Sequence, residues 1–269
     1  MVARAIRHIH HHISSHTLTR NLQKTGYLRD LEQLVRFAAL RTSLPTVARI
    51  GMMLRIPELT HAHEAAPRIR AHAIRSLALY DRLRQEDPIK LRQTLFTKVF
   101  DAGEDGTLSF EEIVTNAQGY VVAGSDTTAI TLTYLVWALG SRPDLKQALV
   151  EELKTLPPDF QDTDLKALLH LNNIINETLR VYSSVPSALP RQVPSGGANL
   201  AGYWIPEGTT VCCQAYSMHR NPEIWPEPDE FKPSRWVNPT KAMTDAFMPF
   251  GAGSRSKCIN ITFLVHQVI

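Results

Sequence analysis

The chain has 269 residues, of which 43% are hydrophobic and 20% are charged, so it can bury a sizeable core in one or two domains. Its net charge of +3 hides an uneven distribution: residues 1–100 carry 17 Lys and Arg against 7 Asp and Glu, whereas residues 101–269 carry 12 against 19. Because the basic residues are spread singly along helical patterns, we expect a solvated helix surface and no nucleic-acid partner.

The cysteine content and the longest apolar stretch indicate the compartment. Three cysteines, two of them adjacent at Cys212 and Cys213, are too few for a disulfide framework and favour a reducing environment. The apolar stretch 113–139 is interrupted by polar residues such as Asn116 and Asp126. It therefore predicts a long buried helix rather than a membrane span, and no signal peptide is expected.

Residues 1–27 are expected to form an irregular extension. Its histidines offer zinc ligands, but no cysteine or carboxylate lies nearby, so a flexible run is favoured over a metal site. These histidines are His8, His10, His11 and His12.

Helical periodicity begins at Leu28 and predicts helices over 28–41, 68–85 and 91–100. The segment between the first two, from Leu44 to Pro57, is apolar and bounded by prolines. It predicts either a loop packed over a cavity or a surface that dips into lipid.

Residues 101–112 imitate a calcium-binding EF-hand loop through Asp101, Asp105 and Glu112. The third position is Gly103, which offers no ligand oxygen. A turn followed by a helix start is favoured instead, with Ser109 as the N-cap and Glu112 completing a capping box.

The helix predicted over 110–139 contains the string Ala123-Gly124-Ser-Asp126-Thr127-Thr128. Gly124 and the threonines lower the helix propensity and permit a local distortion. An acid beside an alcohol on a buried helix suits a proton relay, and the alternative is that Asp126 merely satisfies backbone groups.

Helices are also expected over 141–156 and 171–182, and the second holds Glu177 and Arg180 one turn apart, where they can pair. Short strands are predicted around Arg191 and over 198–213. Core packing is the expected role of Cys212 and Cys213. An ordered, proline-rich coil over 221–236 leads towards the last motif.

That last motif is Phe250-Gly251-Ala-Gly-Ser-Arg255-Ser-Lys-Cys258. Gly251 predicts a sharp turn or a close approach, Arg255 a fork of donors for a carboxylate, and Cys258 a thiolate. Together they suit a heme held by sulfur on the iron and by arginine on a propionate. The alternative is a surface loop with a buried cysteine.

Taken in order, four strings resemble those of the cytochrome P-450 family of heme-thiolate monooxygenases, most closely the fungal microsomal type. They are Ala123-Gly-Ser-Asp126-Thr127-Thr128, Glu177-Thr-Leu-Arg180, Phe231-Lys-Pro-Ser-Arg235-Trp236 and Phe250-Gly-Ala-Gly-Ser-Arg255. The resemblance covers residues 28–255. It implies a mainly α fold with a small β portion, in which a long central helix crosses the heme.

The resemblance also implies roles for individual residues. Asp126 and Thr127 would deliver protons to bound dioxygen, beside Ala123 and Gly124 at the heme, whereas Thr128 would be structural. Arg191 and Arg255 would hold the heme propionates, Cys258 would ligate the iron, and Phe250 and Gly251 would pack around the sulfur. Glu177, Arg180 and Arg235 would form a buried charge triad.

The partners implied by the resemblance are an apolar small molecule, such as a secondary metabolite, together with O2 and an NADPH-dependent reductase. The implied location is the cytosolic face of the endoplasmic reticulum, with residues 44–57 touching the membrane. No anchor is expected in this chain, which can then be soluble, and roughly the first third of the family's length is expected to be missing.

The motif around Cys258 departs from the family pattern, in which one residue separates arginine from cysteine. Here Ser256 and Lys257 both intervene, and Asn260 stands where the family has glycine. One extra residue moves the sulfur by about 3 Å. One hypothesis is that residues 256–269 are an aberrant tail translated from an unspliced intron, because Ser-Lys-Cys can be encoded by AGTAAGTGC. The alternative to an active enzyme is then a fragment that cannot bind heme.

Overall fold

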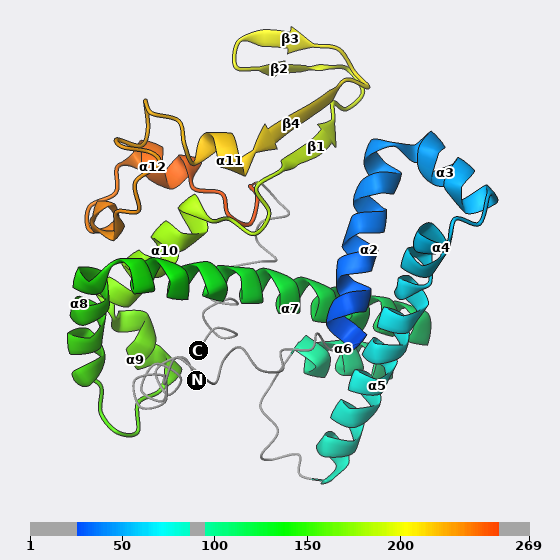
Figure 1. Cartoon of the computed structure of the whole chain (residues 1–269), viewed down its shortest axis with the longest axis horizontal. Helices are drawn as coiled ribbons and strands as arrows, with labels where there is room; N and C mark the ends of the chain where they lie inside the picture. Colours follow the sequence, from blue (N-terminus) through cyan, green and yellow to red (C-terminus); the bar gives the residue numbers. More distant parts are fainter. Residues whose placement is uncertain (1–25, 87–94, 253–269) are drawn as a thin grey trace. The chain divides into compact units, whose positions relative to one another are not determined.

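The computed structural model describes residues 26–86 and 95–252 (Figure 1). In these residues the chain is mainly helical, with two small two-stranded sheets, which confirms the mainly α fold with a small β portion. The described residues fall into two compact units that divide within helix α7 (Phe110–Ser141), between Ser125 and Asp126. None of the helices described is long and apolar enough to cross a bilayer.

The N-terminal unit is helical throughout. Helix α2 (Gly26–Ser43) packs against α3 (Pro45–Met53), α4 (Pro57–His63) and α5 (Ala65–Glu86), and α6 (Leu95–Glu104) follows. The helical pattern predicted at residues 28–41 and 68–85 is confirmed. Small and aliphatic side chains of α5 and the first turns of α7 form the core, with Phe96 and Phe100 packed against it: Ala73, Leu77, Val114 and Ala117.

The proline-bounded segment 44–57 is helical, so the expectation of a loop is wrong. Pro45 and Pro57 each stand in the first turn of a helix, where the missing amide hydrogen is not needed. Between them the chain reverses at Arg55, whose φ of 52° is left-handed. The apolar character remains at the surface, where Met53 and Leu54 are 77% and 71% exposed.

Helix α7 starts at the predicted capping box. The Ser109 amide donates to the Glu112 carboxylate over 2.8 Å, and the Glu112 amide donates back to the Ser109 hydroxyl over 3.4 Å. Asp101 and Gly103 lie in the last turns of α6, so these positions of the EF-hand-like string are helical rather than part of a calcium loop.

The C-terminal unit is organised around α10 (Leu169–Val181), which is almost entirely buried. The second half of α7, α8 (Pro143–Lys154) and α9 (Asp162–Ala167) surround it with leucine-rich faces. The Glu152 carboxylate accepts the His170 and Leu171 amides at 2.7 and 2.8 Å, which places a negative charge at the N-terminus of α10.

Two antiparallel pairs form the β portion. Strand β1 (Ala188–Gln192) pairs with β4 (Thr210–Gln214), and β2 (Ala198–Leu200) pairs with β3 (Tyr203–Ile205). The turn between β2 and β3 uses positive φ at Ala201 and Gly202, which suits a tight hairpin. Cys212 and Cys213 lie on β4 and are exposed, so the expectation that they pack in the core is wrong, because two strands alone leave their faces uncovered.

Between Ala215 and Ala252 the structure describes three short helical elements (Figure 1): α11 (Ala215–Met218), the 3-10 turn η1 (Pro233–Trp236) and α12 (Lys241–Ala246). Trp225 and Trp236 pack with Met243 and Ala246 into a small core beneath them. The proline-rich coil is therefore ordered by aromatic packing, as predicted.

The Glu177 carboxylate joins this coil to α10. Both of its oxygens are fully buried and accept five hydrogen bonds. Arg180 donates twice at 2.9 Å, the Arg235 Nε and the Lys232 amide donate at 3.0 and 2.8 Å, and the Trp236 indole donates at 2.9 Å. We call Glu177, Arg180, Arg235 and Trp236 the Glu177 network.

Both arginines of the Glu177 network also bind backbone carbonyls of the coil. Arg180 donates to the carbonyls of His219, Pro228 and Glu230 at 2.6–2.9 Å, so every N–H of its guanidinium is used. Arg235 donates to the carbonyls of Pro226, Glu227 and Glu230. The network therefore ties a segment that lacks regular hydrogen bonding to the buried helix.

Removing the charge of Glu177 leaves two buried guanidinium groups without a counter-charge. We expect Glu177→Gln to lower the free energy of unfolding by about 3–5 kcal/mol, because the stranded cations keep their desolvation cost. Urea unfolding followed by circular dichroism measures this loss. Glu151→Gln is the matched control, since Glu151 only pairs with Lys154 at the surface and its loss has little effect. Equal stability of the two variants would contradict the prediction.

Candidate functional site

The acid–alcohol pair predicted on the long helix lies on α7, where Asp126 and Thr127 are half-buried. The Thr127 carbonyl accepts hydrogen bonds from the hydroxyls of Thr131 and Ser184, each at 2.9 Å, and these two hydroxyls lie 3.0 Å apart. Ser184 follows α10, so this hydroxyl cluster fastens the middle of α7 to the end of α10. Sequence reasoning missed Ser184, because nothing in its neighbours marks a helix contact.

Ala123 and Gly124 precede the acid–alcohol pair in the same helix, which runs unbroken through them. Gly124 and the threonines therefore do not interrupt the helix. Thr128 is buried, and its hydroxyl has no hydrogen-bond partner within the described residues. A buried hydroxyl without a partner costs free energy, and the structural role expected of Thr128 stays a prediction.

We call the motif from Phe250 to Cys258 the glycine loop; its described part, Phe250–Ala252, lies beside β1. Gly251 has a φ of +77° and donates its amide to the Met248 carbonyl at 3.0 Å. A Cβ at this position would stand 3.3 Å from the Leu189 side chain, so both the backbone conformation and the close approach favour glycine. Phe250 packs against the leucine-rich core around α10. The predicted site residues Arg255 and Cys258 lie outside the described residues.

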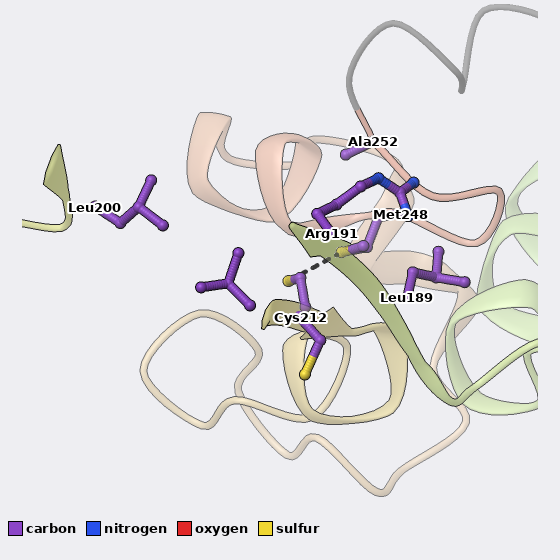
Figure 2. Close-up of a pocket in the computed structure, with 8 residues that line it drawn as sticks. Leu189, Arg191, Leu200, Cys212, Met248 and Ala252 are labelled. Carbon is purple, nitrogen blue, oxygen red and sulfur yellow. Dashed lines mark hydrogen bonds between the residues drawn. The ribbon is translucent and has the colours of Figure 1, made fainter. Parts of the chain in front are cut away.

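A pocket of about 280 Å³ opens between the two long strands and this loop (Figure 2). Its walls are mainly apolar, with one guanidinium and two thiols: Leu189, Arg191, Leu200, Val211, Cys212, Cys213, Met248 and Ala252. In Figure 2 the Arg191 side chain extends past Met248 towards Ala252. Asp126 and Thr127 are not among the lining residues.

The residues around the pocket fit the edge of a heme. A porphyrin presents an apolar ring and two carboxylates, and the pocket offers aliphatic walls together with the exposed guanidinium of Arg191, which suits a carboxylate. At Gly251 the backbone passes close to the Leu189 side chain, and glycine adds no side chain at this edge of the pocket.

His219 is a buried residue near the site that sequence reasoning missed. It is fully buried; its Nδ1 lies 3.1 Å from the Arg180 carbonyl, and its Nε2 accepts the Met248 amide at 2.9 Å. Burial lowers the pKa of His219 from its ordinary 6.5 to about 4, and the Arg180 and Arg220 cations act in the same direction. The ring is therefore neutral at physiological pH, and no sequence motif marks it.

Comparison with known proteins identifies the family. The cytochrome P-450 family matches residues 54–259, more than half of the chain. Cytochrome P-450 monooxygenase orf2 of Aspergillus niger is 42% identical over 247 residues, covering 91% of this chain and 50% of the relative. The monooxygenases tazI of Aspergillus terreus and azaI of Aspergillus niger are 42% and 38% identical, over 49% and 56% of their lengths.

The chain thus spans about half the length of the curated relatives it matches. The four strings singled out in the sequence all lie within the matched residues, at 123–128, 177–180, 231–236 and 250–255. The chain belongs to the cytochrome P-450 family.

Proposed function

We propose that this chain acts in a heme-dependent monooxygenase that hydroxylates an apolar small molecule, in the manner of fungal secondary-metabolite enzymes. The observation that carries the proposal is the apolar pocket with Arg191 on its wall, beside the Gly251 turn of a chain that belongs to the cytochrome P-450 family. The relatives it matches are named monooxygenases. The co-substrate is O2, and a reductase using NADPH supplies the electrons.

In this proposal Cys258 would ligate the iron, Arg191 and Arg255 would hold the propionates, and Phe250 and Gly251 would pack around the sulfur. Bound heme supplies the metal that activates dioxygen, with electron density donated by a thiolate. These assignments follow the family motif, and the described part of the loop supports them through the Gly251 turn beside Leu189.

With heme bound, Asp126 and Thr127 would deliver protons, next to Ala123 and Gly124. The Thr127 hydroxyl holds a proton at the reacting side and Asp126 replaces it from solvent, which its half-buried position allows. The Ser184 and Thr131 hydroxyls fix the Thr127 backbone and so limit the positions available to its side chain.

The alternative function is that of a fragment that keeps the fold of this half but does not hold heme. The spacing Arg255-Ser256-Lys257-Cys258 favours it, because the extra residue displaces the sulfur. An unspliced intron from about residue 256 would explain that spacing, and a transcript that runs contiguously through Cys258, with no spliced form, would contradict this explanation.

The reduced, CO-bound absorption spectrum of the purified 269-residue chain, loaded with hemin, tests the proposal. We expect a Soret band at the position of thiolate ligation that is lost in Cys258→Ser, because a thiolate changes the electronic structure of the iron more than a hydroxyl does. A histidine-type band, or no bound heme, supports the fragment instead. Glu177→Ala, which breaks the network that holds the loop, is expected to abolish heme retention.

Thr127→Ala tests the proton relay in a heme-loaded protein supplied with reductase, NADPH and a turned-over substrate. Product formed per NADPH consumed is expected to fall, because a positioned proton donor contributes about 10²-fold or more to the rate of the productive step. Thr133→Ala is the control, because Thr133 is exposed on the same helix and its hydroxyl donates to the Ala129 carbonyl one turn earlier. Equal coupling in both variants would exclude the relay role.

We further propose that the chain works at the cytosolic face of the endoplasmic reticulum and contacts lipid through residues 44–57. Supporting this, α3 and the turn after it expose a row of apolar side chains that includes Val47, Ile50, Met53 and Leu54. Arg49 and Arg55 are exposed beside them and suit lipid phosphates.

The double variant Met53→Glu, Leu54→Glu tests this contact by co-sedimentation with phosphatidylcholine vesicles. Each buried apolar side chain contributes about 1.5–3 kcal/mol, so we expect the bound fraction to fall at least tenfold. Leu169→Glu is the control, since Leu169 is an exposed leucine at the start of α10. Unchanged sedimentation of the double variant would contradict a lipid contact through residues 44–57.

A further inference from the structure

His219 connects two parts of the C-terminal unit that are far apart in the sequence. Its Nε2 accepts the amide of Met248, two residues before Phe250, and its Nδ1 faces the carbonyl of Arg180 in α10. Because Nε2 accepts a hydrogen bond, the ring proton of the neutral imidazole sits on Nδ1 and is donated to Arg180. The Phe247 ring lies against the imidazole, with centroids 5.5 Å apart.

This geometry accepts only the neutral imidazole. A second proton would sit on Nε2, directly opposite the Met248 amide hydrogen, and two donors would then face each other 2.9 Å apart. The charges around the ring also favour the neutral form. Arg180 and Arg220 are cations that oppose a third positive charge, and Glu177 on α10 is the one anion among the groups that act on it. Phe247 and Met248, on the remaining side, carry no charge.

We propose that His219 is a positioning residue, whose neutral imidazole bridges α10 to the chain at Met248 and thereby fixes the start of the glycine loop. Protonation of His219 breaks the bridge and frees the described residues from Met248 to Ala252. The consequence for the cofactor rests on the proposed function, because the loop leads to the residues assigned to heme. The bridge itself belongs to the fold of this chain and is testable without heme.

The bridge is expected to weaken at low pH, because burial lowers the pKa of His219 in the folded chain. A group whose folded pKa is depressed contributes its stability above its unfolded pKa and loses it as the pH falls towards the folded pKa. For His219 the loss runs from about pH 6.5 down to about pH 4. With a pKa of 6.5 when the bridge is open and about 4 when it is closed, the equilibrium constant for opening the bridge is expected to rise about 30-fold between pH 8 and pH 5.

Amide hydrogen exchange of the full chain, purified without added heme, tests the bridge. Exchange of the Met248 amide is measured by mass spectrometry at pH 8 and pH 5, and corrected for the intrinsic pH dependence of exchange. A peptide from the middle of α10 serves as the internal reference. In the wild-type chain we expect the corrected rate at Met248 to rise about 30-fold at pH 5 relative to the reference.

Two variants distinguish the hydrogen bonds of the His219 ring from its packing. His219→Phe keeps the aromatic contact but has no hydrogen-bonding atoms, so Met248 is expected to exchange roughly tenfold faster or more at both pH values. His219→Gln keeps a donor and an acceptor and cannot be protonated in this range, so Met248 is expected to stay protected at pH 5.

Three results would overturn the proposal. The first is a rise at pH 5 in His219→Gln equal to that of the wild type, which would assign the acid sensitivity to Glu177 or another group. The second is the absence of any rise in the wild type, and the third is unchanged protection in His219→Phe. If His219→Phe does not fold, the comparison of the wild type with His219→Gln still decides. A negative heme spectrum leaves this test unaffected, so the two proposals fail separately.

Discussion

The carboxylate of Glu177 is the group on which the C-terminal unit depends. It is fully buried, and its five hydrogen-bond donors come from a neighbouring turn of α10 and from a coil more than 50 residues away. Two arginines against one carboxylate leave a net positive charge in the protein interior. Such a cluster is stable because its donors find oxygens: besides Glu177, Arg180 and Arg235 donate to three backbone carbonyls each in the coil. The Glu177 network therefore gives a shape to residues 226–236, which have little regular structure of their own.

The same network extends to the candidate site through shared residues. The His219 carbonyl accepts from Arg180, and the His219 ring lies between the Arg180 carbonyl and the Met248 amide. From Met248 the chain continues through Phe250 to the Gly251 turn beside β1. A second connection runs from the end of α10 through Ser184 to the carbonyl of Thr127 on α7. Helix α10 thus holds both the loop assigned to the sulfur side and the helix assigned to proton delivery.

The sequence predicted the features whose interacting residues lie within one helical turn of each other. The Ser109–Glu112 box marks the start of α7 because both partners lie within one turn, and the spacing of Glu177 and Arg180 puts them on one face of a helix. Arg235 lies 58 residues from Glu177, so its place in the network was expected only from the family resemblance. His219 and Ser184 carried no local signal, since each acts through backbone atoms of a distant segment.

The errors have equally physical causes. For residues 44–57 we expected either a packed loop or a surface that dips into lipid. The loop is wrong, because proline also fits the first turn of a helix and two helices begin at these prolines. Adjacent cysteines on a strand suggested core packing, but the sheet of β1 and β4 has only two strands and exposes both thiols.

A double-mutant cycle between Glu177→Gln and Arg235→Gln, followed by urea unfolding, tests most directly whether these residues act as one unit. We expect the double variant to lose less stability than the sum of the two single variants, by about 2 kcal/mol or more, because removing the second partner relieves the charge left by the first. Losses that add to within about 0.5 kcal/mol would show that Glu177 and Arg235 act independently and would contradict a shared network.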